Sequence, residues 1–205
     1  MKKLLSILFF VAMAAVAVAQ TPQEIISRME TEMEKHEKEG IVMTVDAKIS
    51  ILGTVTTKTY SLGDKMRSEG KMMGIEIITW TDGNTEWSYN SKTNEVEISR
   101  QEESSETEGD AEMFNDITDG YDVTIDKETD KAWYLLCKKS KSNKDKDDPK
   151  KIELAIAKKT YMPISLKTKM SGVTITMRDI SFGVTEKQVT FDAKNYPGVK
   201  IVDKR

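Results

Sequence analysis

The chain has 205 residues, with 31 Lys and Arg against 34 Asp and Glu and a formal net charge of −3. Acidic and basic residues are mixed along the chain without a basic patch, so we do not expect a nucleic-acid-binding protein. The single cysteine, Cys137, excludes an internal disulfide. It alternates with Trp133 and Leu135 in a strand-like run, which predicts a buried thiol.

The first 19 residues have the features of an export signal. Lys2 and Lys3 precede the apolar stretch LLSILFFVAMAAVAV, and Ala17-Val18-Ala19 fits the small-x-small rule for cleavage. We therefore expect a signal peptide at 1–19, a mature chain that begins at Gln20, and a location in the periplasm or outside the cell. After this stretch the sequence is nowhere apolar for long enough to span a bilayer.

The mature chain, residues 20–205, has a length that suits one domain, and we expect it to begin with an amphipathic helix over 22–39. Thr21-Pro22-Gln23-Glu24 matches a capping box with proline in the first turn. An apolar stripe at helical spacing follows, formed by Ile25, Ile26, Met29 and Met33. The remaining residues are charged up to Gly40, a typical helix end. The stripe fits an ordinary core and a cavity lining equally well.

From Ile41 onward the apolar period changes to two, which is typical of strands. Residues 41–51 alternate between an apolar and a polar face, and a Thr-rich strand follows Gly53 up to Leu62. Further strands are predicted at 65–69, 75–81, 85–90, 94–99, 121–126, 131–138, 151–158, 163–170, 173–182 and 188–192. These lengths and turn signals indicate a mainly β fold, an antiparallel meander whose apolar face the N-terminal helix would cover.

The hairpin at 81–98 contains Trp87 and Tyr89 two residues apart, so their side chains point to the same side of the strand. They fit either ordinary core or the wall of a cavity. Residues 101–112 are acidic and small, which favours a mobile loop. Met113, Phe114 and Ile117 follow, and they could add one apolar helical turn.

Residue types that carry catalysis or bind metals are scarce. His36 is the only histidine, and the sequence has no nucleophile elbow, phosphate loop, dinucleotide fingerprint or clustered zinc ligands. The loop at 138–151 resembles a calcium loop only superficially, because an EF-hand begun at Asn143 needs Gly and Glu where this chain has Asp148 and Leu154. We therefore expect no cofactor, no metal and no enzymatic activity, which favours a binding function.

Three stretches, taken together and in order, resemble the LolA-like periplasmic lipoprotein carriers, in the version found in Bacteroidota. GNTEWSYNSKTNEVEIS (83–99) is similar to their G-x-T-x-W-x-Y-N hairpin, and IAKKTYMPISLKTKM (156–170) to their D-x-K-T-x-x-P segment. VTFDAKNYPGVKIVDKR (189–205) is similar to their C-terminal ending. One departure is clear: proteobacterial carriers have Arg-Pro in the turn after the second strand, where this chain offers only Lys65 or Arg67.

The resemblance implies a curved antiparallel sheet, an incomplete or half barrel, closed by an N-terminal amphipathic helix. It also implies a carrier that takes acylated lipoproteins from an inner-membrane ABC exporter to the outer membrane, with the acyl chains in an apolar cavity. We expect a monomer, and the sequence names no outer-membrane acceptor. The alternative is an envelope protein on the same scaffold that senses lipids or lipoproteins and signals to a membrane partner.

The residues that we expect to line this cavity are Ile25, Met29, Met33, Met43, Val45, Ile49, Met66, Met73, Ile75, Ile77, Trp87, Tyr89, Val96, Ile98, Met113 and Phe114. Methionine is abundant among them, and its flexible, polarizable side chain suits a surface that packs on itself when empty and on lipid when full. For each methionine taken alone, core filling is the better interpretation. The lipid-binding interpretation therefore depends on the whole set lying together.

Overall fold

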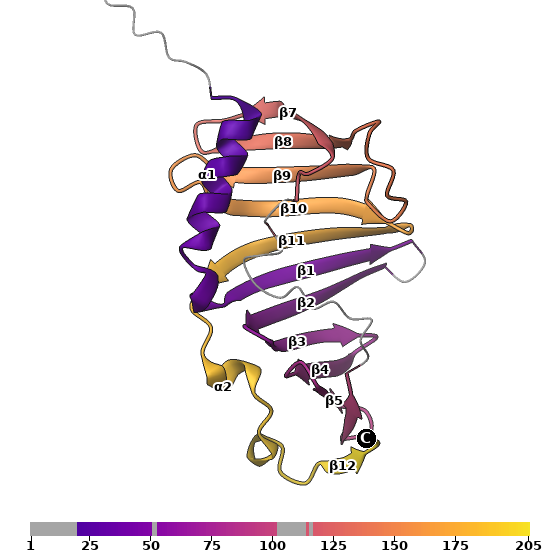
Figure 1. The fold of residues 1–205 in the computed structure, drawn as a ribbon. Coiled ribbons are helices and arrows are strands. Elements are labelled where there is room, and N and C mark those ends of the chain that lie inside the picture. The colour runs from indigo at the N-terminus through magenta and orange to yellow at the C-terminus, as the bar shows by residue number, and fades with distance from the viewer. Residues whose placement is uncertain (1–19, 51–52, 102–113, 115–116) are drawn as a thin grey trace, which may run out of the picture.

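The computed structural model describes residues 20–50, 53–101, 114 and 117–205, which form a mainly β fold, as predicted (Figure 1). The strands of this described part are β1 Ile41–Ile49, β2 Gly53–Leu62, β3 Lys65–Met72, β4 Ile75–Thr81, β5 Thr85–Asn90, β6 Glu95–Arg100, β7 Tyr121–Glu128, β8 Ala132–Lys139, β9 Lys151–Ala157, β10 Pro163–Met170, β11 Val173–Phe182 and β12 Lys200–Asp203. The helical segments there are α1 Pro22–Glu34, η1 Glu37–Glu39, α2 Glu186–Val189 and η3 Ala193–Asn195.

The strands form one large, curved, open sheet in the order β12-β6-β5-β4-β3-β2-β1-β11-β10-β9-β8-β7 (Figure 1). Two antiparallel meanders, β1 to β6 and β7 to β11, join where β1 pairs with β11. The edge strand β12 is the exception, because it runs parallel to β6. The meander predicted from the sequence is therefore confirmed within each half, while the long-range pairings that join the halves and add β12 were not predicted.

The strand predicted at 188–192 is wrong. The chain instead forms α2 after Thr185, where Thr185 and Gln188 make a capping box. The Gln188 side-chain oxygen accepts a hydrogen bond from the Thr185 backbone amide at 2.8 Å. Val189, at the end of this turn, is buried beside Tyr60 and Val184. The alternation of apolar residues at 188–192 thus reflects one helical turn and the segment after it.

The register of the strands assigns each side chain to one of two faces. Met43 on β1 stands opposite Thr59 on β2, and the same face continues through Ser68 on β3 and Thr79 on β4 to Ser88 on β5. We call it the helix face, because α1 packs on it. The opposite side, which we call the tail face, carries the side chains of alternate residues and is contacted by the C-terminal segment after β11.

Helix α1 packs on the half of the helix face formed by β1 and β7–β11, and it crosses the ends of β7–β11 (Figure 1). Its stripe of Ile25, Ile26, Met29 and Met33 is at most 5% exposed and belongs to the same apolar cluster as these strands. The predicted capping box at Thr21 is confirmed. The helix is shorter than predicted, because it ends at Glu34 and a short 3-10 turn leads to Gly40.

Gly40 makes this connection possible. Its φ of +66° favours glycine, and an added Cβ would lie 2.4 Å from the carbonyl oxygen of Ser61. The chain can therefore pass tightly from the helix into β1.

The described residues show a helix packed on part of the sheet, and they do not show the complete closure of a half barrel that the resemblance implies.

The structure also bears on the sequence predictions for Cys137, for the charged loop, and for membrane-spanning helices and metal sites. Cys137 is fully buried, as predicted, and burial raises the pKa of its thiol to about 11. Residues 140–150 form the loop between β8 and β9, and most of its side chains are exposed. The expectations for 102–112, Met113 and the signal peptide lie outside the described residues. Within those residues, no helix has the length and apolar character needed to cross a membrane, and no group of potential metal ligands gathers.

Candidate functional site

The helix face changes character across the sheet. On β1 and β7–β11 it is apolar, and much of it packs beneath α1. On β2–β5 it becomes a band of small hydroxyl side chains, formed by Thr57, Thr59, Ser68, Thr79 and Ser88. Apolar residues return at one end of the same strands, with Val55, Ile75 and Ile77. The helix face is therefore apolar on β1 and β7–β11 and lined by small hydroxyl side chains on β2–β5. It becomes apolar again at the ends of β2 and β4 where Val55, Ile75 and Ile77 lie.

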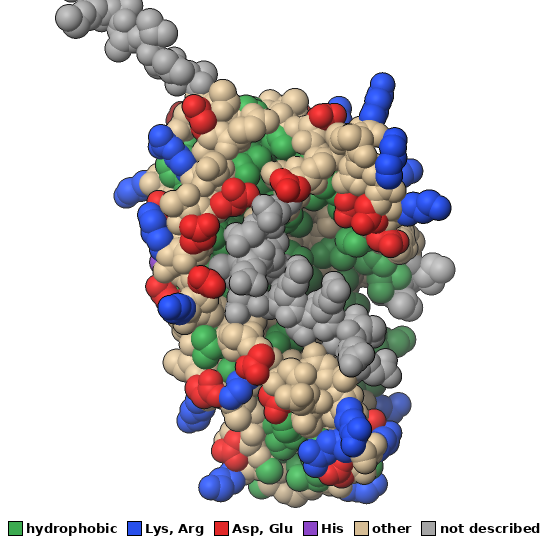
Figure 2. All heavy atoms as spheres, viewed as in Figure 1, with side chains coloured by type: hydrophobic (Ala, Val, Ile, Leu, Met, Phe, Trp, Pro, Cys, Tyr) green, Lys and Arg blue, Asp and Glu red, His purple; other side chains and the backbone are tan. Residues whose placement is uncertain are grey.

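Several of these apolar side chains remain partly accessible. Val45 on β1, Ile175 and Met177 on β11, and Ile77 on β4 are only half-buried. A shallow depression of about 250 Å³ lies over β2–β4, lined by residues that include Val55, Thr57, Met72, Ile77 and Thr79. Figure 2 shows hydrophobic side chains open to view on the side of the molecule that carries α1. An accessible apolar surface of this kind on a water-exposed fold is typical of a binding site.

The predicted cavity residues do not all lie together. The helix-face set comprises Ile25, Met29, Met33, Met43, Val45, Ile49, Met66, Ile75 and Ile77, and Phe114 is buried in the same cluster as α1. The tail-face set comprises Trp87, Tyr89, Val96 and Ile98. Met73 lies in the turn between β3 and β4 and is 90% exposed. Met113 lies outside the described residues. Ten of the sixteen predicted residues therefore lie on the helix-face side of the sheet.

Trp87 and Tyr89 instead belong to an aromatic cluster on the tail face. The Trp87 ring stacks on Phe191 with centroids 6.0 Å apart, and the Tyr89 ring lies 5.0 Å from Tyr196. Trp80 contacts both C-terminal rings, at 5.3 Å from Phe191 and 5.5 Å from Tyr196. Burial also raises the pKa of Tyr196. These aromatics therefore hold the C-terminal segment against the sheet, and they are not available to a ligand under α1.

Arg67 and Lys65 also lie on the tail face. The Arg67 guanidinium carbon is 5.5 Å from the centroid of the Tyr60 ring and 5.7 Å from that of Trp80, and the group pairs with Glu69. Lys65 pairs with Glu186 in α2, which raises the pKa of Lys65. On the tail face, Lys65 therefore holds α2 to the sheet, and Arg67 packs on the aromatic rings of neighbouring strands. Neither occupies the place of an arginine that ties the sheet to α1.

The attachment of α1 uses a residue that the sequence reasoning missed. Tyr161, in the turn between β9 and β10, accepts hydrogen bonds through its hydroxyl from Gln20 Nε2 at 2.8 Å and from an Arg28 guanidinium nitrogen at 2.9 Å. Its ring lies 5.3 Å from that of Trp133, with the Arg28 guanidinium 5.2 Å from the ring centroid. Tyr161 lies within the motif at 156–170, but nothing in the sequence indicates that its partners are on the helix.

Together these features define a class of protein: an open, mainly β scaffold whose own C-terminal segment packs on the β2–β6 part of the tail face. Among the residues that the structure describes, its apolar helix face is covered only in part by α1. No protein-family model and no curated protein matches the sequence.

Solved structures with similar folds were found. They include an uncharacterized conserved protein from Thermus thermophilus, with 19% identity, a TM-score of 0.48, and coverage of 89% of this chain and 98% of that one. A LolA superfamily protein from Nitrosomonas europaea has 14% identity, a TM-score of 0.31, and coverage of 85% and 99%. In the MucA/MucB complex of Pseudomonas aeruginosa, the matched chain has 14% identity, a TM-score of 0.40, and coverage of 83% and 61%. At these identities and scores, neither a family nor a function follows from the similarities.

Proposed function

We propose that the protein is a periplasmic carrier, without enzymatic activity, that binds the acyl chains of lipoproteins on its helix face and moves them from the inner to the outer membrane. The observation that carries this proposal is the half-buried apolar surface on β1, β4 and β11, next to the region that α1 covers. The sequence resemblance to LolA-like carriers supports the same function. The donor would be an inner-membrane ABC exporter, and the protein would act as a monomer.

The energetics suit reversible loading. One acyl chain that leaves water gains on the order of 10 kcal/mol, at about 0.8 kcal/mol for each methylene. The four buried side chains of α1 gain roughly 1.5–3 kcal/mol each from their own burial. Displacing this stripe during loading therefore costs an amount similar to the gain from one chain. A helix that competes with the cargo for the same surface lets the cargo be released again.

A pair of adjacent substitutions tests the proposal. Val55 lies on the helix face of β2, within the shallow depression, and its neighbour Thr54 is exposed and points to the tail face. Val55→Asp and Thr54→Asp add the same charge one residue apart. We expect lipid or lipoprotein to co-purify with the wild-type protein and with Thr54→Asp, detected by mass spectrometry, and to be lost from Val55→Asp. Equal loading of both variants would contradict binding on the helix face.

Depletion in cells separates transport from sensing. If the protein is a carrier, its depletion should leave lipoproteins in the inner membrane. If the lipoproteins stayed correctly sorted after depletion, the same apolar face would serve a sensor that signals to a membrane partner, and the transport proposal would be wrong.

A further inference from the structure

Antiparallel strands place alternate turns at alternate ends of the sheet. The turn between β3 and β4, the turn between β5 and β6, the turn between β10 and β11, and the loop at 140–150 between β8 and β9 therefore lie at the same end. We call this end the open rim. The turn that holds Tyr161 against α1 lies at the other end of the sheet, so the helix is attached away from the open rim (Figure 1).

The open rim carries exposed methionines at two hairpin tips. Met73 is 90% exposed, Met72 is 45% exposed, and Met170 is 40% exposed. Met73 has a φ of +53° and precedes Gly74, so the turn directs a flexible apolar side chain into solvent at the tip of the hairpin. The two tips lie between β3 and β4 and between β10 and β11, which are four strand spacings apart in the sheet, so the tips are separated by roughly 19 Å. Two separated apolar tips do not pack on each other, and both remain available to a partner.

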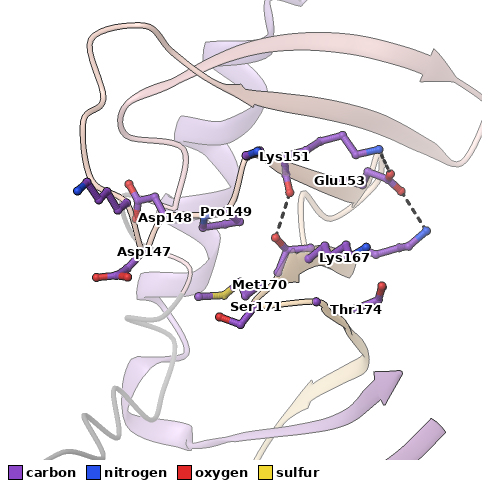
Figure 3. A pocket seen from close by; sticks show the side chains of 14 residues that line it. Asp147, Asp148, Pro149, Lys151, Glu153, Lys167, Met170, Ser171 and Thr174 are labelled. Atoms are coloured by element: carbon purple, nitrogen blue, oxygen red, sulfur yellow. Dashed lines mark hydrogen bonds and ion pairs between the residues drawn. The ribbon is translucent and has the colours of Figure 1, made fainter. Parts of the chain in front are cut away.

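Lysines gather beside the Met170 tip. Residues 139–151 contain six lysines and three aspartates, and residues 167–174 contain two lysines and no acid, although the whole chain has a net charge of −3. The two segments border a cavity of about 760 Å³, in which Lys151 and Lys167 both face Glu153 (Figure 3). Their ammonium groups lie 2.6 and 3.5 Å from that carboxylate and lower its pKa. Glu153 is thus already neutralised by its neighbours.

Three further lysines of the open rim are exposed and free to meet an external anion. Within the described part of the chain, Lys146, Lys150 and Lys169 make no ion pair. Exposed apolar side chains among unpaired lysines fit the interface of an anionic bilayer, where the apolar groups enter the boundary layer and the ammonium groups contact lipid phosphates. A soluble acidic protein would match the lysines, but the isolated exposed methionines favour a lipid surface.

We propose that the open rim docks on the surface of an anionic phospholipid bilayer. This inference rests on the proposed function in one respect, because it makes the open rim the entrance through which acyl chains reach the helix face. Ile49, Val55, Ile75 and Val173 of the helix face lie at the strand ends that reach this rim. A protein docked in this way presents the end of its apolar face to the membrane. Acyl chains then pass between bilayer and helix face along a short path.

Vesicle flotation with the purified protein, in the absence of lipoprotein, tests the docking. We expect binding to vesicles of equimolar phosphatidylglycerol and phosphatidylcholine, weak binding to pure phosphatidylcholine, and loss of binding as salt is raised. The triple variant Lys146→Glu, Lys150→Glu and Lys169→Glu should bind at least about 100-fold more weakly. The matched control makes the same change at the exposed residues Lys38, Lys131 and Lys159 and should bind like wild type.

A label reports the depth of the methionine tip. Met73→Cys carrying an environment-sensitive fluorophore should brighten and shift to the blue on anionic vesicles, whereas the same label on Lys131→Cys should not. Cys137 is buried and stays unlabelled in the folded protein. Absence of binding to both vesicle types, equal weakening by both triple variants, or an unchanged label at position 73 would each overturn the docking proposal.

Failure of docking is separable from failure of the proposed function. If Val55→Asp still binds vesicles but wild-type protein never carries lipid, the carrier proposal is wrong and the docking surface stands. If the wild-type protein carries lipid but does not bind vesicles, the docking proposal is wrong and the carrier proposal stands.

Discussion

Removing one hydroxyl group should loosen α1 without disturbing the sheet. In Tyr161→Phe, the ring keeps its place 5.3 Å from Trp133, while three hydrogen bonds are lost: two accepted, from Gln20 Nε2 at 2.8 Å and Arg28 at 2.9 Å, and one donated to Gln20 Oε1 at 3.2 Å. These bonds are partly exposed to water, so their combined net contribution is about 1 kcal/mol, the typical net value of a single hydrogen bond. We therefore expect the local opening of α1 to become easier by about fivefold.

Hydrogen exchange measured by mass spectrometry resolves this effect. Peptides that cover residues 20–34 should exchange about fivefold faster in the variant, while peptides from β9 should be unchanged. Tyr134→Phe is the control, because Tyr134 is 40% exposed on a strand of the same sheet. If exchange in α1 matched wild type, or if the whole sheet accelerated equally, Tyr161 would not be the attachment point of the helix. If α1 competes with cargo, the variant should also load lipid faster.

Two further predictions concern the interior of each half. The Cys137 thiol has a pKa raised from 9.0 to about 11, so its stabilising effect is complete below pH 9 and is lost as pH rises toward 11, because the unfolded chain gives up the proton first. Urea unfolding across this window should show wild type losing roughly 2–3 kcal/mol relative to Cys137→Ala, and parallel curves would contradict the burial argument. Phe191→Ala removes the ring that contacts Trp80, Trp87 and Tyr196, and it should cost about 2 kcal/mol with a change in tryptophan fluorescence. Unchanged stability and fluorescence would mean that the C-terminal segment is not held by these rings.

The sequence predicted the elements well because their signals are local. The capping box at Thr21 and the period-two runs from β1 to β11 depend only on neighbouring residues, and the structure confirms them. The edge strand β12 was missed because it has four residues and pairs with a strand about a hundred positions earlier. The false strand at 188–192 was avoidable, since Thr185-Glu186-Lys187-Gln188 is itself a capping-box pattern.

Assignment of side chains to faces was the larger difficulty. Alternation places Trp87 and Tyr89 of β5 on one side of the sheet, but it does not tell whether Met43 of β1, four strands away, lies on the same side. That information resides in the register through β2, β3 and β4, which the turns set one pair at a time. An error of one residue at any turn exchanges the faces. The predicted cavity therefore mixed residues from the two sides, although each strand was identified.

The separation of the two faces supports the proposed binding on the helix face more strongly than any single residue does. On the tail face the chain completes its own packing, since aromatic rings of β4 and β5 meet Phe191 and Tyr196 from the C-terminal segment. A ligand there would have to displace a covalently attached competitor at very high local concentration. On the helix face α1 packs on part of β1 and β7–β11, while half-buried apolar residues remain on β1 and β11 and continue onto β4. If the protein binds an apolar guest as proposed, binding therefore costs least on the helix face, and substitutions there should alter loading before they alter stability.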